Sequence, residues 1–272
     1  MSFYNLSFSY LQVGDLHRAM ESAREAMRIF QTALPPTHPY VSAAQQHVQG
    51  ILEGIQESSF AADDSSAHAH AARRMRDAGG VIITRHRGGG CAAADYSLQF
   101  RSIFNTFTAD VRLCGGCFYW EVEVVDIDGV VQFGVCTEGF EAREDAGGEG
   151  VGDDAWSWAA DGVRLHKWHE GDQGAYGSAW AVGDIVGFAV DMRTAGAAVM
   201  SVFVNGSCAA PNGPAFTAID APYLSPALSA SGGRYRLNLG HRPFAHAPHD
   251  DAHYVSVHAH HLQHQQQQQQ AE

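Results

Sequence analysis

Apolar and polar side chains alternate along much of the chain after residue 81, and this pattern restricts the fold more than any other feature. In the stretch YWEVEVV, Trp120, Val122 and Val124 alternate with a tyrosine and two glutamates, which is the period of a half-buried strand. The stretch GDIVGFAVDM is apolar on both faces and is predicted to be a central strand. The stretch AVMSVFVNG ends in an Asn-Gly pair, which favours a hairpin turn because both residues tolerate a positive φ.

Short strands of this kind, separated by turns, predict a mainly β fold in which two antiparallel sheets pack as a sandwich. The chain has 272 residues, of which 45% are hydrophobic and 29 are glycine, so it can bury a core and form many tight turns. Its formal net charge of -13 argues against a general affinity for nucleic acid or for an anionic membrane, because both require clustered Lys and Arg. We therefore expect a protein partner, and neither nucleic acid nor membrane.

Residues 1–57 have the period of helices instead. Apolar residues at helical spacing predict a first helix before Gly14, a second that carries Ala19, Ala23 and Ala26 on one face, and a third that begins after the prolines of LPPTHP. Small residues along one face allow another helix to approach closely, so the first two helices are expected to pack as an antiparallel pair.

The stretch NLSFSYLQVGDLHRAMESAREAMRIF resembles a tetratricopeptide repeat, and the connector LPPTHPYV is similar to that of the longer repeats in kinesin light chains. The residues that carry the resemblance are Leu6, Tyr10, Gly14, Ala19 and Ala26. It implies an α-helical tetratricopeptide hairpin of about one and a half repeats over residues 1–57. Residues 58–78 have the composition of a linker, and the His- and Gln-rich tail at 249–272 is predicted to be disordered because glutamine repeats offer little to bury.

The stretch MSFYNLSFSYLQ lacks the basic residues and the apolar run of a signal peptide, and no apolar run reaches the roughly 20 residues of a membrane span. The five cysteines are an odd number and are scattered along the chain. We therefore expect a reducing, cytoplasmic location with free thiols.

The stretch GVGDDAWSWAADGVRLHKWHEG, which runs from Gly150 to Gly171, resembles the core motif of SPRY domains. The matching positions are Gly150 to Asp154, Ser157 to Ala159, Asp161, Gly162, Lys167 to His169, Gly171, Tyr176, Gly177, Trp180, Gly183, Asp184 and Gly187. The stretches FVNG, YLSPALS and LNLGHRPF are also similar to later strands of that family. The resemblance implies a two-sheet, concanavalin-like sandwich over residues 79–248 that binds proteins, usually through a short peptide held by loops at one end. The family is not known for catalysis.

Trp156 is the strongest candidate for contact with such a peptide. It follows two aspartates among predicted loops, so it is expected to point outward while Trp158 points into the core, and it is then either an anchor for a partner or only partly buried. Trp158, Trp168 and Trp180 are interpreted as core residues, because a buried indole contributes a large apolar area. The predicted peptide-binding residues are Phe140, Asp154, Trp156, Arg164, His166, His169 and Tyr176.

Three groups of residues could bind a metal, but each has a simpler interpretation. Asp153 and Asp154 are adjacent carboxylates without the further oxygen ligands that Ca2+ needs, so a turn that binds backbone N–H groups is favoured. Cys114 and Cys117 form a C-x-x-C pair without the second pair of a structural zinc site, so a Gly-Gly turn between two thiols is favoured. The stretch HAHH could bind Ni2+, Cu2+ or Zn2+ adventitiously, but a disordered tail is favoured. We therefore expect neither a metal nor another cofactor.

The sequence contains no G-x-S-x-G, H-E-x-x-H or phosphate-binding-loop motif, and nothing supplies a nucleophile to accompany Asp161, His166 and His169. It therefore predicts a non-catalytic adaptor, in which a helical repeat segment and a SPRY-like sandwich each bind protein. A lectin-like sandwich that binds carbohydrate through aspartate and aromatic loops is the alternative.

Overall fold

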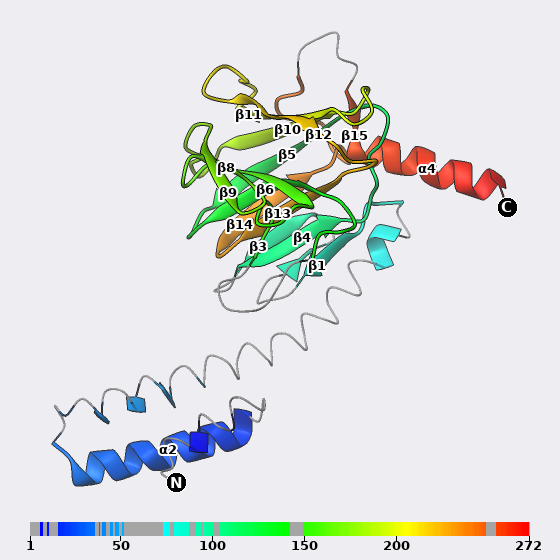
Figure 1. The fold of residues 1–272 in the computed structure, drawn as a ribbon. Coiled ribbons are helices and arrows are strands. Elements are labelled where there is room, and N and C mark those ends of the chain that lie inside the picture. The colour runs from blue at the N-terminus through cyan, green and yellow to red at the C-terminus, as the bar shows by residue number, and fades with distance from the viewer. Residues whose placement is uncertain are drawn as a thin grey trace. The chain divides into compact units, whose positions relative to one another are not determined.

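The structure is a computed structural model that describes residues 6–7, 10, 16–35, 38, 40–41, 44–45, 47–48, 51, 73–76, 79–86, 91–93, 95–100, 104–141, 149–248 and 254–271. The chain separates into two compact units, Met1–Ser66 and Ala67–Glu272 (Figure 1). The first unit is described mainly through one helix, and the second is a β-sandwich.

In the first unit, one helix lies wholly within the described residues: α2, Leu16–Ala33. Ala19 and Ala23 on its buried face form a small apolar cluster with Val48 and Ile51, a close approach that small side chains permit. The predicted first and third helices lie largely outside the described residues. The tetratricopeptide hairpin is therefore not shown, and it stays a prediction.

The second unit is built from two packed sheets (Figure 1). Within the described residues, the first sheet has seven strands, in the spatial order β1 (Ile83–His86), β4 (Asn105–Ala109), β13 (Ser225–Ala230), β6 (Val131–Cys136), β7 (Ser157–Asp161), β8 (His166–His169) and β9 (Asp172–Ala175). The described part of the second sheet has eight strands, in the order β12 (Gly213–Ile219), β11 (Ala198–Val204), β10 (Ile185–Asp191), β5 (Cys117–Asp126), β14 (Gly233–Asn238), β3 (Ser97–Phe100) and β2 (Cys91–Ala92), with β15 (Val255–Ser256) beside β5. All pairings are antiparallel except that of β15 with β5, so the predicted two-sheet antiparallel sandwich is confirmed.

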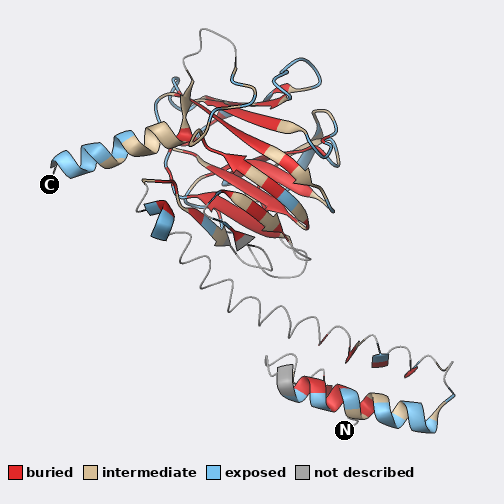
Figure 2. Ribbon diagram, turned by 180° about the vertical axis from the view of Figure 1, so that it is seen from behind, coloured by how far each residue is buried: buried red, intermediate tan, exposed pale blue. Residues whose placement is uncertain are grey.

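The core lies between the two sheets, where the strands are buried along most of their length (Figure 2). Trp120, Val122 and Val124 of β5 belong to it and are at most 1% exposed, as their alternation predicts. Trp120 stacks on Phe188 of β10, with ring centroids 5.6 Å apart. Burial of such aromatic side chains supplies much of the hydrophobic stabilisation of the sandwich.

Two of the three tryptophans interpreted as core residues lie in this core. Trp158 and Trp180 are each 7% exposed and belong to the central cluster. Trp168 is only partly buried and packs against a separate apolar cluster around Val151. It therefore differs from its prediction, because β8 lies next to the edge of the first sheet.

The opposite face of β5 is buried as well, although the alternation predicts a half-buried strand. Tyr119 on this face packs against Phe244. The carboxylate of Glu121 is 2% exposed and accepts hydrogen bonds from the backbone N–H groups of Ala245 and His246, at 2.9 and 2.7 Å. The chain that follows β14 therefore covers this face, and Glu121 satisfies backbone groups that would otherwise be buried without a partner.

Part of the predicted linker at 58–78 belongs to the second unit. Residues 73–76 are helical, and Met75 is 5% exposed within the core of the sandwich. The apolar side chain of Met75 explains this attachment, which the polar composition around it concealed. The rest of the predicted linker lies outside the described residues.

The structure also differs from the predicted disorder of the tail at 249–272. β15 pairs with the start of β5, and α4 (Val257–Ala271) follows it directly. Val257 is fully buried in the core, and the N–H of His258 donates to the carbonyl of Leu239 at 2.8 Å. Val255 and Val257 attach the tail to the core through apolar contacts, while the far end of α4 is exposed (Figure 2). No helix in the described part of the chain is long and apolar enough to span a lipid bilayer.

Gly134 of β6 offers a test of how tightly the first sheet packs. A Cβ at this position would lie 2.0 Å from the carbonyl oxygen of Trp158 in the neighbouring strand. We predict that Gly134→Ala lowers the free energy of unfolding by about 1–3 kcal/mol, because backbone atoms in the centre of a sheet cannot move aside cheaply. Urea denaturation followed by tryptophan fluorescence measures the change.

Gly174→Ala is the matched control, because Gly174 lies in edge strand β9 and its added Cβ would be 3.5 Å from the side chain of Lys167. This variant should change the free energy of unfolding by less than about 0.5 kcal/mol. Equal stability of the two variants would contradict the packing described for β6 and β7.

Candidate functional site

A cavity of about 850 Å³ opens on the sandwich beside β12, the strand at the edge of the second sheet. One side of it comes from the first sheet, through the turn after β6, the loop before β7, and β8. The other side comes from β12 and the loop that follows it. Prominent lining residues are Trp156, Lys167, His169, Phe216, Asp220 and Tyr223. The volume is within the range of cavities that bind small molecules or single peptide side chains.

Trp156 forms one wall of the cavity and is 54% exposed. Its backbone N–H donates to Oδ1 of Asp154 at 3.1 Å, and its carbonyl accepts the N–H of Thr137 at 2.8 Å. Its indole lies against the backbone of Gly139, where an added Cβ would be 2.6 Å from the ring. The indole is therefore presented at the surface by a loop that is fixed on both sides.

The loop at 149–156 lies on the outer face of the first sheet and is attached there by buried polar groups. The backbone N–H of Val151 donates to Oγ of Ser229 in β13 at 2.9 Å. The same Oγ lies 2.7 Å from Oγ1 of Thr106 in β4. Val151 and Ser229 are both 0% exposed, so each of these groups depends on the other for its hydrogen bond.

The two aspartates of the loop shape its turn. Asp153 accepts hydrogen bonds from the backbone N–H of Gly150 at 2.7 Å and from Nε2 of Gln132 in β6 at 2.9 Å. Asp154 accepts the hydroxyl of Ser157, in addition to the N–H of the neighbouring tryptophan. The favoured interpretation of these carboxylates, a turn that binds backbone N–H groups, is confirmed.

His169 and Lys167, at the end of β8, form the floor of the cavity. The ring of His169 stacks on that of Trp158 with centroids 4.6 Å apart, and its Nδ1 lies 2.9 Å from the carbonyl oxygen of Ser157. The ammonium group of Lys167 donates to the carbonyl of Ala215 in β12 at 2.6 Å and so joins the two sides of the cavity. Both side chains are therefore held in position by the protein itself.

Two carboxylates and one ammonium group, that of Lys167, line the cavity. Glu138 and Asp220 line it from opposite sides. Glu138 pairs with Arg112 at 2.9 Å, but both side chains of this pair are more than 65% exposed, so water and salt screen it strongly. The cavity thus combines aromatic and apolar walls with carboxylates at its edge.

The structure divides the seven predicted peptide-binding residues into three groups. Trp156 and His169 line the cavity, and Asp154 lies beneath the tryptophan and holds its N–H. The other end of β8 carries Arg164, His166 and Tyr176, which lie outside the cavity lining. Phe140 is 7% exposed and packs in a small cluster below the loop.

The residues at the far end of β8 make contacts of their own. Arg164 forms an ion pair with the buried carboxylate of Asp161, and its guanidinium lies 4.2 Å from the centroid of the Trp168 ring. A ring nitrogen of His166 contacts the carbonyl of Arg164. The hydroxyl of Tyr176 donates to the carbonyl of Gly213, and burial raises the pKa of this phenol.

Phe140 shares its cluster with Cys136, whose thiol is also buried. Burial raises the pKa of Cys136 to about 12, with a smaller contribution from the negative charge of Asp154. The thiol is therefore protonated near neutral pH and is not an activated nucleophile. Phe140 and Cys136 support the loop from below.

The wall formed by β12 and the loop after it, which includes Phe216, Asp220 and Tyr223, was not predicted from the sequence. No strand was expected at the stretch GPAFTAI, in which apolar and polar residues do not alternate regularly. Nothing local in the sequence indicates that this strand lies at the edge of a sheet, beside the tryptophan loop.

Residues 117–242, which are less than half of the chain, match the family model of the SPRY domain. This part of the chain is similar to SPRY domains. SPRY domains are generally modules that bind other proteins.

A stretch of 152 residues, or 54% of the chain, is 31% identical to the "E3 ubiquitin-protein ligase RKP" of Arabidopsis thaliana. The chain spans about a tenth of the length of that curated relative, namely 11%. The solved SPRY domain of human HERC1 is 18% identical, with a TM-score of 0.45 over 56% of this chain and 94% of that one. A second human SPRY domain is also 18% identical, with a TM-score of 0.45 over 59% of this chain and 99% of that one.

Ser229 tests the attachment of the tryptophan loop. We predict that Ser229→Ala lowers the free energy of unfolding by about 1–3 kcal/mol, because it leaves the buried N–H of Val151 without an acceptor. Chemical denaturation measures this change. Ser207→Ala, at an exposed serine, is the control and should have an effect within about 0.5 kcal/mol of zero. A Ser229→Ala protein as stable as the control would show that the loop does not depend on this hydrogen bond.

Proposed function

We propose that the SPRY-like domain of this chain is a non-catalytic adaptor module that binds an extended segment of a partner protein in the cavity beside Trp156. The observation that carries this proposal is an exposed tryptophan, held by its own backbone contacts, at the mouth of a preformed cavity. Tryptophan is among the residues that contribute most to protein–protein binding. An indole that is already fixed loses little conformational freedom when a partner binds.

The apolar walls of the cavity favour an apolar side chain at the centre of the bound partner segment. Trp156 and Phe216 face the cavity together with the buried or partly buried side chains around them. An aliphatic or aromatic side chain of the partner would be removed from water there, which contributes about 25 cal/mol for each Å² of apolar surface. We therefore propose an apolar anchor residue in the bound segment.

The carboxylates of Glu138 and Asp220 favour a positively charged residue in the bound partner segment. The chain has a formal net charge of -13, so its surroundings also attract cations. A Lys or Arg beside the anchor would lie close to the rim, and this electrostatic attraction would increase the rate of association more than the final affinity. We propose a segment that places a basic residue next to its apolar anchor.

The position of β12 supports an extended conformation of the partner. Within the described residues, β12 pairs with β11 and with no other strand. An edge strand offers backbone groups to which an added strand can bind. Lys167 already occupies the carbonyl of Ala215, so the segment would lie beside the later part of the strand, toward Ile219.

The predicted contact residues take different parts in this proposal. Trp156 and His169 would touch the partner, and Asp154 would position the tryptophan. Phe140 supports the loop from the interior. A contribution of Arg164, His166 and Tyr176 stays a prediction and would require a second contact area at the other end of β8.

The relative in Arabidopsis thaliana is named an E3 ubiquitin-protein ligase, and we propose that the region shared with it recognises a protein rather than catalyses a reaction. The polar groups at the floor of the cavity support this view, because Lys167 and His169 are engaged in structural hydrogen bonds. Cys114, Cys117, Cys136 and Cys208 are free thiols, which supports the predicted reducing, cytoplasmic location. The N-terminal unit would supply a second protein-binding surface if it forms the predicted repeat.

Selection from a displayed random-peptide library with the full chain identifies the bound segment. Peptides with an apolar anchor and an adjacent Lys or Arg should be enriched. We predict that Trp156→Ala weakens binding of a selected peptide at least about tenfold, because it removes the exposed anchor. Isothermal titration calorimetry measures the affinity, and thermal denaturation shows that the variant is folded.

Val182→Ala is the matched control for this variant, because Val182 is also a large exposed apolar residue, at 62%, and lies outside the cavity lining. It should leave the affinity unchanged. If the Trp156→Ala protein bound the peptide with full affinity, the proposal that the peptide binds beside Trp156 would be wrong. Glycan binding that is lost on chelation of Ca2+ would instead favour the lectin-like alternative.

Asp220 tests the proposed charge of the segment. We predict that Asp220→Asn weakens binding of the same peptide about threefold to tenfold at low ionic strength, and that the difference shrinks in high salt as the rim charge is screened. Asp172→Asn, at an exposed position on edge strand β9, is the control with the same change of net charge. Equal losses in both variants would show that only the overall charge matters.

A further inference from the structure

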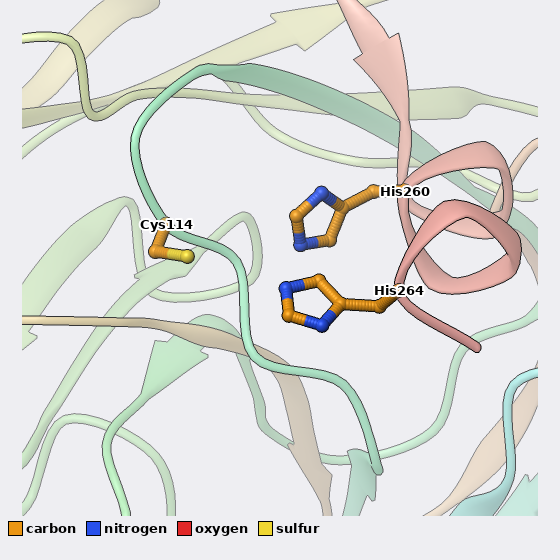
Figure 3. A group of neighbouring side chains, drawn as sticks. All are labelled: Cys114, His260 and His264. Carbon is orange, nitrogen blue, oxygen red and sulfur yellow. The ribbon is translucent and has the colours of Figure 1, made fainter. Parts of the chain in front are cut away.

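A second group of reactive side chains lies where the tail helix meets the turn before β5 (Figure 3). Cys114 belongs to this turn, and His260 and His264 belong to α4. The sulfur of Cys114 and one ring nitrogen of each histidine all lie within 4.8 Å of one another. Figure 3 shows the sulfur directed toward the two imidazoles, which lie side by side.

The pairing of β15 with β5 explains why these residues meet. β15 lies beside Phe118 and Tyr119 at the start of β5, and α4 continues from it without a break. The first turns of α4 are therefore placed next to the turn that leads into β5. His260 contacts the edge of the Phe118 ring, with centroids 4.9 Å apart, and its Nε2 lies 3.0 Å from the carbonyl oxygen of Arg112.

The spacing of the two histidines suits a metal ion. His260 and His264 are one turn apart on the same face of α4, and their ring centroids are 5.1 Å apart. Helical histidines at this spacing can direct two nitrogens at one ion, as in H-E-x-x-H zinc sites. A cavity of about 400 Å³ adjoins both rings and is also lined by Asp110 and Arg112, while Cys114 lies outside its lining.

The neighbouring cysteine of the C-x-x-C pair does not take part. Cys117 is 5% exposed, and its thiol is hydrogen bonded to Asp191. Burial raises its pKa, and the contact with Asp191 raises it further. Cys114, in contrast, is exposed in the turn, with Gly115 directly after it. The two cysteines therefore face different surroundings, and only Cys114 meets the histidines.

We propose that Cys114, His260 and His264 bind a zinc ion, with a water molecule as the fourth ligand. One thiolate and two imidazoles form a donor set that zinc prefers, whereas Mg2+ and Ca2+ take oxygen ligands. Zinc binds sulfur at about 2.3 Å and nitrogen at about 2.0–2.1 Å, so tetrahedral ligand atoms lie about 3.3–3.6 Å apart. The three side chains therefore need to close by up to about 1.5 Å to reach these distances.

The bound ion would fasten α4 to the sandwich. Beyond His264, the helix consists of glutamines that are almost all exposed, and a short helix without packing is only marginally stable in water. A metal that joins Cys114 to two turns of α4 contributes its binding free energy to the folded form of the tail. The zinc site thus makes the order of the tail dependent on metal. It does not depend on the peptide-binding site.

Titration of the full reduced chain with Co2+ tests the proposal, because Co2+ is a spectroscopic substitute for Zn2+. We expect binding of a single equivalent with the visible spectrum of a tetrahedral ion and a sulfur-to-cobalt charge-transfer band in the near ultraviolet. Added Zn2+ should abolish both signals. Absence of Co2+ binding, or binding without the sulfur band, would overturn the proposal, since histidines of the tail alone would then account for any metal that is bound.

Variants assign the ligands. Cys114→Ser should abolish the charge-transfer band, and His264→Gln should weaken Co2+ binding at least about tenfold, which is the smallest loss expected even for a change outside the ligands. Cys208→Ser, at another exposed free thiol, is the matched control and should leave the spectrum unchanged. A band that survives Cys114→Ser, or that disappears in Cys208→Ser, would overturn the assignment.

Hydrogen exchange of the tail measures the structural role. Zn2+ should slow exchange of backbone N–H groups in α4 at least about tenfold in the wild-type chain and should have no such effect in Cys114→Ser. Equal exchange with and without Zn2+ would overturn the proposed fastening of the helix. Peptide binding is measured in the same samples, so a failure of the zinc site is distinguishable from a failure of the peptide site.

Discussion

The hydrogen bond from the backbone of Val151 to the hydroxyl of Ser229 fastens the tryptophan loop to the sandwich, and the candidate site depends on it. Both groups are fully buried, and the hydroxyl of Ser229 also contacts that of Thr106. A loop in another position on the sheet would leave these polar groups without their hydrogen bonds. Gln132 adds a second attachment through Asp153. Because a buried polar group without a partner costs about 1–3 kcal/mol, these contacts favour one position of the loop over all others. The wall that carries Trp156 is thus positioned by buried polar groups together with the small apolar cluster beneath the loop.

Only some parts of this site could be predicted from the sequence. A strand period of two would put Trp156 and Trp158 on the same side, yet they are 54% and 7% exposed. The difference arises because Trp156 lies in the turn before β7, which begins at Ser157. The turn-forming role of the aspartates follows from their short side chains, which bind backbone N–H groups nearby. The opposite wall could not be predicted in this way. Its residues, such as Phe216, reach the cavity because β12 lies at the edge of a sheet, and the order of strands depends on pairings between distant parts of the chain.

The structure of the tail could not be predicted from the sequence either, for a different reason. The composition of the tail predicts disorder because glutamines and histidines dominate it. The start of α4 is nevertheless ordered, because the single apolar side chain of Val257 is buried in the core. The apolar core accepts this side chain because β15 pairs with β5 at Phe118, a residue that is far away in the sequence. Phe140 is predicted to contact a peptide, and this stays a prediction; its position in a loop gave no sign that it packs in a cluster with Val151. Each difference arises where one apolar side chain finds a distant partner.

The two sites described above differ in how much of their order exists before a ligand arrives. At the cavity, Trp156, Lys167 and His169 already have their hydrogen bonds, so a partner need not order them and most of the free energy of contact remains available for affinity. At the tail, residues 266–270 of α4 are exposed, so an ion that joined the helix to Cys114 would have to order it while binding. A preformed site gives affinity that varies little with conditions, whereas a site coupled to folding responds steeply to the concentration of its ligand. The same sandwich can therefore hold a constant recognition surface and a tail whose order depends on its surroundings.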